Sequence, residues 1–162
     1  MSFYEDLKFG QDSERLLVMK YKFLEQTDGR KGDLRIKCTN IIVEKKADSY
    51  DPDKYSNFIM ERWSKEGAPG GPFQSLKNGC RYFLYQFVQK NRIYVFDTVQ
   101  LVARIKKLVK KNNLPLYDKH NVGYITQYYK IPISMLEDLN LGMEKLEKLY
   151  LQAKKKTDKL KK

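Results

Sequence analysis

The sequence has few of the residues that build cross-linked or zinc-binding proteins. It contains only two cysteines, Cys38 and Cys80, which form no CxxC pair and indicate no disulfide framework. The single histidine, His120, has no cysteine or histidine partner that would indicate a zinc site. We therefore expect reduced cysteines and a reducing intracellular compartment, the cytoplasm.

Long apolar segments are also missing. No run approaches the roughly 20 apolar residues that a membrane-spanning helix needs, and no signal-peptide pattern opens the chain. These absences predict a soluble intracellular protein without a membrane partner.

Positive charge, in contrast, is abundant. The 162 residues carry a net charge of +12, which predicts a polyanionic partner. Nucleic acid is the first expected partner and an anionic membrane the second. Part of the excess lies in residues 154–162, where a phosphate-binding segment and a solvated helix end are both consistent with the lysines. No base-reading motif is present, so sequence specificity is not predicted.

The apolar pattern predicts a mixed α/β protein built around one sheet. The predicted helices cover residues 3–8, 12–26, 73–78, a long helix starting at 97 or 98, a capping-box helix from 134, and 143–162. The predicted strands cover residues 33–37, 41–46, 56–63, 80–89, 92–96 and 123–131.

The predicted hairpin formed by residues 33–37 and 41–46 combines an apolar face with a charged face. Side chains alternate across a strand, so Glu44 and Lys46 share one face. A two-residue turn would place Asp33 opposite Lys46, whereas a longer turn would shift this register. The alternation assigns the core face to four apolar residues: Leu34, Ile36, Ile41 and Val43.

Two converging carboxylates would repel each other unless a cation lies between them, so this pattern indicates a divalent metal site. Oxygen ligands from Asp33 and Glu44 favour Mg²⁺ or Mn²⁺. Such a metal lowers the pKa of a bound water, which becomes a nucleophile for phosphodiester hydrolysis. Lys46 would position or help to deprotonate this water, or neutralise charge on the phosphorane.

The spacing of these residues is rare in this chain. Glu44 is the only glutamate followed two residues later by a lysine, and it lies at the end of a predicted inner strand. An ordinary surface hairpin with a solvated polar face is the alternative interpretation.

Residues 3–109 resemble the PD-(D/E)XK nuclease superfamily in its small bacteriophage-type members. Asp33 matches the first-strand aspartate, although Gly32 replaces the usual proline, and Glu44 and Lys46 match the (D/E)XK motif. Glu14 matches a glutamate of the first helix that many members use as a further metal ligand. The resemblance implies a restriction-endonuclease-like α-β-β-β-α-β core.

The resemblance also implies an activity, that of a Mg²⁺-dependent deoxyribonuclease. It assigns catalysis to Asp33, Glu44 and Lys46, and metal binding to Glu14, Asp33 and Glu44. The partner would be DNA, in the host cytoplasm if the protein is phage-encoded, and a homodimer is consistent with the many members that cut both strands. We expect a nuclease-like domain over residues 1–142 and a basic helical tail over 143–162.

Two further functions compete with this hypothesis. The first is a non-catalytic, basic nucleic-acid-binding protein on the same fold, and the second is a membrane or protein interaction module that uses the last helix. Gln74 and Glu61 are additional site candidates, with solvated side chains as the alternative for both. Lys45 is expected to point away from the metal and to have no special role.

Overall fold

The computed structural model describes residues 3–161, which form helices and strands in alternating groups. The α-helices in this part of the chain are α1 (Phe3–Lys20), α2 (Gly71–Lys77), α3 (Thr98–Asn112) and α4 (Gly142–Leu160). The strands are β1 (Leu24–Gln26), β2 (Leu34–Ile36), β3 (Ile42–Asp48), β4 (Asn57–Trp63), β5 (Tyr82–Phe87), β6 (Arg92–Asp97), β7 (Tyr117–Asn121) and β8 (Tyr124–Pro132).

The central sheet contains five strands in the order β1-β2-β3-β5-β6. Its first three strands form an antiparallel meander, β5 is parallel to β3, and β6 is antiparallel to β5. A parallel pair requires a crossover connection, and the one between β3 and β5 contains β4 and α2. The predicted α/β class with a mixed central sheet is confirmed.

The prediction of a single sheet is wrong. Strand β4, expected beside the other strands, instead pairs with β8 in a separate antiparallel sheet of order β4-β8-β7. Strand β7 was not predicted, because its sequence Tyr-Asp-Lys-His-Asn has no apolar alternation and all but its last residue are exposed. Pairing with β8 alone therefore keeps β7 extended.

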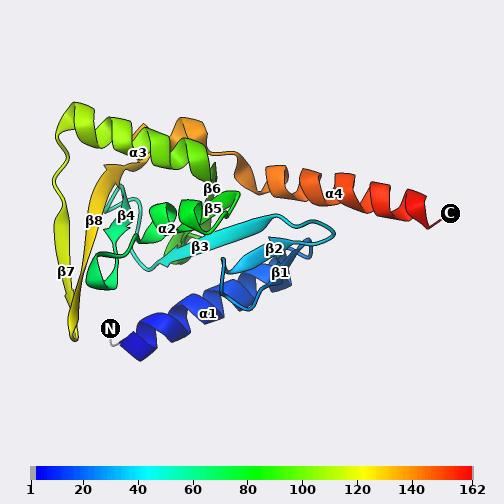
Figure 1. Ribbon diagram of the computed structural model, residues 1–162, viewed down its shortest axis with the longest axis horizontal. Helices are drawn as coiled ribbons and strands as arrows, with labels where there is room; N and C mark the ends of the chain where they lie inside the picture. The colour runs from blue at the N-terminus through cyan, green and yellow to red at the C-terminus, as the bar shows by residue number, and fades with distance from the viewer. Residues whose placement is uncertain (1–2, 162) are drawn as a thin grey trace.

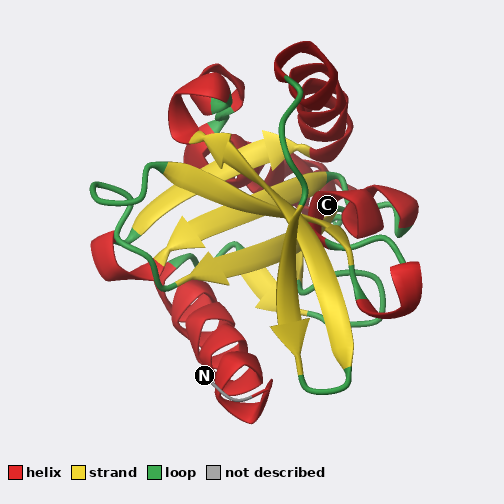
Figure 2. Cartoon of the chain, turned by 90° about the vertical axis from the view of Figure 1, so that its left-hand side faces the viewer, coloured by secondary structure: helices red, strands yellow, loops and turns green. Residues whose placement is uncertain are grey.

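Two apolar clusters lie on the two faces of the central sheet. Helices α1 and α4 supply Leu17 and Leu146 to one cluster, which also contains Val43 of β3. The other cluster joins the opposite face to α2, α3 and the second sheet, with Phe58 packed edge-on against Tyr85. Figure 1 shows α1 and α3 on opposite sides of the sheet, and Figure 2 shows the strands at the centre with helices around them.

A hydrogen-bonded tyrosine links the two sheets inside the second cluster. The Tyr85 hydroxyl donates to Asp48 Oδ2 at 2.5 Å and accepts from the Ile59 N–H at 3.0 Å. Burial, with the adjacent Asp48 carboxylate, raises the pKa of Tyr85 well above its usual value. The buried end of β3 is thereby fixed to β4.

The first helix differs from its predicted boundaries. Residues 3–8 and 12–20 form one continuous helix through Gly10, and the chain then turns into β1 instead of continuing as a helix to residue 26. Both Phe23 and Leu24 are buried, and the strand pairing of Leu24 with Ile36 fixes the extended conformation. Tertiary pairing thus outweighs the helical periodicity of this segment.

The C-terminal helix starts inside the fold and ends outside it. Leu146 is fully buried, whereas the lysines at positions 154, 155, 156 and 159 are exposed, and Figure 1 shows α4 projecting away from the sheet. The predicted capping-box helix at residue 134 is wrong, since residues 133–139 form two 3₁₀ turns without a side-chain cap. Within residues 3–161, none of the helices is long and apolar enough to cross a membrane.

Candidate metal and phosphodiester site

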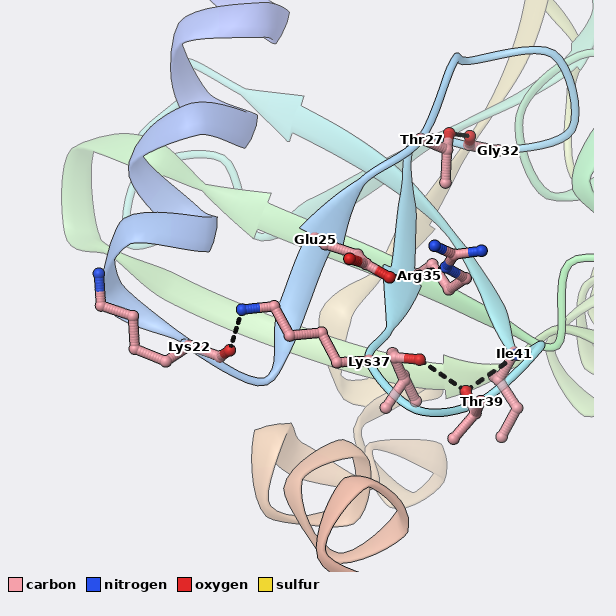
Figure 3. A network of polar contacts seen from close by, with 9 residues as sticks. Lys22, Glu25, Thr27, Gly32, Arg35, Lys37, Thr39 and Ile41 are labelled. Carbon is pink, nitrogen blue, oxygen red and sulfur yellow. Dashed lines mark hydrogen bonds and ion pairs between the residues drawn. The ribbon is translucent and has the colours of Figure 1, made fainter. Parts of the chain in front are cut away.

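The hairpin of β2 and β3 has a longer turn than the two-residue form considered above. Leu34 pairs with Val43 and Arg35 with Ile42, so continuing this register by one residue puts Asp33 opposite Glu44 and not opposite Lys46. Thr39 stabilises the turn, because its hydroxyl donates to the Ile36 carbonyl at 2.7 Å and accepts from the Ile41 N–H at 3.0 Å (Figure 3).

This register shift of two residues leaves the assignment of faces intact. Leu34, Ile36 and Val43 are fully buried, as the alternation predicts. Glu44 and Lys46 point to the opposite face and are half-buried. The charged face of the hairpin is therefore present, although Asp33 has a different cross-strand neighbour.

Asp33 occupies the point where β2 and β3 separate. The two strands pair at only two positions, so the outer edge of β3 beyond Val43 needs other hydrogen-bond partners. The Lys45 N–H donates to Asp33 Oδ2 at 2.8 Å. This bond fixes the Asp33 carboxylate at the open edge of the sheet, beside Glu44.

The carboxylates of Glu14, Asp33 and Glu44 lie close enough to influence one another's pKa values. Burial, together with the charges of Asp33 and Glu14, raises the pKa of Glu44 to about 8. Glu14 belongs to α1, on the other face of the sheet. Burial and the Asp33 charge raise its pKa, whereas the charge of Lys45 and a hydrogen bond from Gln26 lower it. Burial raises the pKa of Asp33, whereas the hydrogen bond and the charge of Lys45 oppose this rise.

The Lys45 side chain points to the face opposite Glu44, as expected, but it has a specific partner, which was not expected. Its side chain is 8% exposed and donates to the Ser13 hydroxyl, which in turn donates to the Gly10 carbonyl at 2.7 Å. Burial lowers the pKa of Lys45 to about 8, against the charges of Glu14 and Asp33. The sequence did contain an indication of this role. Lys45 lies two residues after Val43, and therefore on the same, buried face of the strand.

Lys46 lies one strand position beyond Lys45, on the face of Glu44. Among residues 3–161 it has no side-chain hydrogen bond or ion pair, and its backbone is in register with Tyr85 of β5. A half-buried ammonium group in this position can donate to a bound anion beside Glu44.

Carboxylate oxygens such as those of Glu14, Asp33 and Glu44 are the type of ligand that a hard divalent cation prefers. Their mutual repulsion is the electrostatic condition that a cation relieves. In the part of the chain that the structure describes, however, no three His, Cys, Asp or Glu side chains are arranged to hold a metal ion. For Glu14, Asp33 and Glu44 to coordinate an ion together, their side chains would have to rotate.

The wall behind Glu44 is formed by Cys80 and Gly32. Cys80 donates its thiol proton to the Lys31 carbonyl at 2.7 Å, and burial, with the charges of Glu44 and Asp33, raises its pKa to about 12. A thiol with a raised pKa is a poor nucleophile, so Cys80 is assigned a packing role here. A Cβ at Gly32 would lie 2.5 Å from Ile42 Cγ2 and 2.9 Å from Cys80 Sγ, so only glycine fits at this position.

Two glycine-to-alanine substitutions should therefore change stability in opposite directions. Gly32→Ala is expected to destabilise the protein by about 1–3 kcal/mol through overpacking. Gly10→Ala, in a helix with nothing within 4 Å of the added Cβ, should stabilise it by about 0.5–1 kcal/mol. Urea denaturation of both variants tests the pair, and an unchanged midpoint for Gly32→Ala would contradict the close packing behind Glu44.

The remaining candidates have local partners. Glu61 packs over Gly70, whose added Cβ would lie 2.5 Å from the glutamate Oε2. Gln74 donates to Asn78 Oδ1 at 2.8 Å within α2, and His120 is exposed on β7. None of these contacts involves the carboxylates at the β3 edge.

No protein-family model matches this chain, and comparisons with curated proteins and with solved structures also found no match.

Proposed function

We propose that this protein is a Mg²⁺- or Mn²⁺-dependent nuclease that hydrolyses phosphodiester bonds in DNA. The observation that carries the proposal is the group of three carboxylates at the open edge of β3, with Asp33 fixed by the Lys45 N–H. Carboxylates with raised pKa values beside an unpartnered lysine are typical of a catalytic site.

The order of elements supports the same proposal. Helix α1, the meander β1-β2-β3, helix α2 and strand β5 follow one another in the α-β-β-β-α-β order that the resemblance to PD-(D/E)XK nucleases implies, with β4 inserted before α2. The first helix supplies Glu14. Asp33 precedes the second strand of this order, not the first as expected, because β1 was not predicted from the sequence. The order of elements therefore supports the proposed family assignment, apart from the inserted β4.

Each residue has a distinct task in the proposed reaction. Glu14, Asp33 and Glu44 would hold the ion, which would polarise a phosphoryl oxygen and lower the pKa of a water molecule. Lys46 donates to the phosphate oxygens as negative charge develops on them, or orients the attacking water. Lys45 positions Asp33 through its backbone and offsets the acidic charge through its side chain.

The net charge of +12 suits DNA as the substrate. Both Cys38 and Cys80 are free thiols, which suits the reducing cytoplasm that we propose as the location. The homodimer stays a prediction.

The test is incubation of plasmid, linear, single-stranded and branched DNA, and of RNA, with purified protein. We expect cleavage in Mg²⁺ or Mn²⁺ and none in EDTA. If every substrate stays intact in both metals, the proposed nuclease activity is wrong.

A non-catalytic nucleic-acid-binding protein on the same fold is the second candidate. It is favoured by the exposed lysines on α4, at positions 154, 155 and 156, which lie outside the apolar core. This function predicts binding in EDTA that weakens with salt and that is the same for wild type and Asp33→Asn.

A further inference from the structure

One part of the central sheet has an open polar surface. Strands β1 and β2 present Glu25 and Arg35 on the face that also carries Glu44, and the two side chains form an ion pair at 2.7 Å between Arg35 Nε and Glu25 Oε1. The Arg35 side chain remains 48% exposed. A charged pair at this position leaves the surface available to a polar ligand.

Two hollows in this surface meet at Arg35. One, of about 530 Å³, lies between the 27–32 loop and Ile42, and the other, of about 320 Å³, lies against the turn of Cys38, Thr39 and Asn40. Figure 3 shows Arg35 between Thr27 and Gly32 on one side and Thr39 on the other. We name these joined hollows the β1–β2 trough.

One end of the trough adjoins the carboxylates. Gly32 lines the larger hollow, and a Cβ added to it would lie 3.4 Å from Glu44 Oε2. The trough therefore leads from the β3 edge, where hydrolysis would occur, across Arg35 to the turn at Asn40.

The side chains in the trough suit a chain of phosphates. Its cations are Arg30, Lys31 and Arg35, of which Arg30 is paired with Asp28 at 3.2 Å. Lys31 has no side-chain partner among residues 3–161 and is exposed. Both hollows are open, whereas a small ligand needs an enclosed pocket, so an extended polyanion fits this surface better.

We propose that the β1–β2 trough holds the nucleic-acid strand that continues from the cleaved phosphate, with Lys31 and Arg35 as its phosphate contacts. This inference rests on the proposed function for the position of the cleaved phosphate. Glu25 orients the Arg35 guanidinium, whose fork of donors matches a phosphate. Lys31 acts as a point charge in the larger hollow, which Gly32 also lines.

The binding test uses a fluorescein-labelled single-stranded oligonucleotide in EDTA, so that it does not depend on cleavage. The double variant Lys31→Gln/Arg35→Gln should bind about tenfold more weakly and lower the slope of log affinity against log salt by about 1.4, the value for two lost phosphate contacts. The matched control, Lys106→Gln/Lys110→Gln, removes two exposed lysines of α3 and should change affinity less than about twofold.

The cleavage test separates binding from chemistry. In Mg²⁺ the double variant should raise KM about tenfold and leave kcat nearly unchanged, because the trough contacts substrate and transition state equally. The single variant Lys31→Gln, on an exposed loop, should raise KM by a smaller factor. This variant keeps the test valid if Arg35→Gln lowers the stability of the double variant.

Equal affinity of the double variant and the α3 control would overturn the inference, as would wild-type protein that does not bind the oligonucleotide. A drop in kcat with unchanged KM would also overturn it. Binding that depends on Lys31 and Arg35 without any cleavage by wild type would support the trough and disprove the nuclease, so the two failures are distinguishable.

Discussion

Replacing Lys46 by alanine is expected to lower the rate of DNA cleavage in Mg²⁺ by about 10²–10³-fold, the usual loss when one donor to a developing negative charge is removed. The ammonium group lies on the face of Glu44 and has no hydrogen bond or ion pair within residues 3–161, so its removal breaks no polar contact there. The substitution should therefore affect kcat far more than the thermal midpoint of unfolding.

The matched control for this prediction is Lys54→Ala. Lys54 is exposed in the turn before β4, so its loss removes the same charge away from the carboxylates. Single-turnover cleavage of a saturating linear substrate measures both variants. Equal cleavage rates for Lys46→Ala and wild type would show that Lys46 has no role in catalysis.

The second prediction concerns metal affinity and its dependence on pH. In the metal-free protein the pKa of Glu44 is raised to about 8, mainly by burial, so this carboxyl is largely protonated below pH 8. An arriving cation must displace that proton. The affinity for Mn²⁺ should therefore rise about tenfold per pH unit between about 6 and 8, and should level off above pH 8.

Titration calorimetry with Mn²⁺ in two buffers of different ionisation enthalpy measures both the affinity and the protons released. Near pH 7 we expect about one proton released per ion bound. Glu44→Gln should bind more weakly and lose most of the pH dependence, whereas Glu61→Gln should behave as wild type because Glu61 packs over Gly70. A pH-independent affinity in wild type would contradict the displacement of a proton from Glu44 by the ion.

The sequence predicted the faces of the key hairpin better than its register. Alternation alone placed Val43 in the core and Glu44 with Lys46 outside it, because the period of two holds in any strand. The pairing of Asp33 depended on the turn, where Thr39 bonds to Ile36 and Ile41 in a way that no pattern of apolar residues specifies.

Other parts of the fold depended on contacts between distant segments. Strand β4 has a clear strand pattern, yet only its pairing with β8 shows that it belongs to a second sheet. The role of Lys45 was missed because a charged residue at an inward strand position acts through its partner. That partner, Ser13, lies on α1, far from Lys45 in the sequence. Local sequence cannot supply such pairings.

The central claim is that Glu14, Asp33 and Glu44 bind a divalent cation beside Lys46. A crystal structure of the protein grown with Mn²⁺ tests it most directly, because anomalous scattering locates manganese without assumptions about its ligands. We predict a manganese peak at the open edge of β3, within about 2.0–2.3 Å of oxygens from Asp33 and Glu44, with Glu14 at or near coordination distance. A well-ordered crystal in which manganese binds elsewhere, or leaves these three carboxylates without it, would contradict the account.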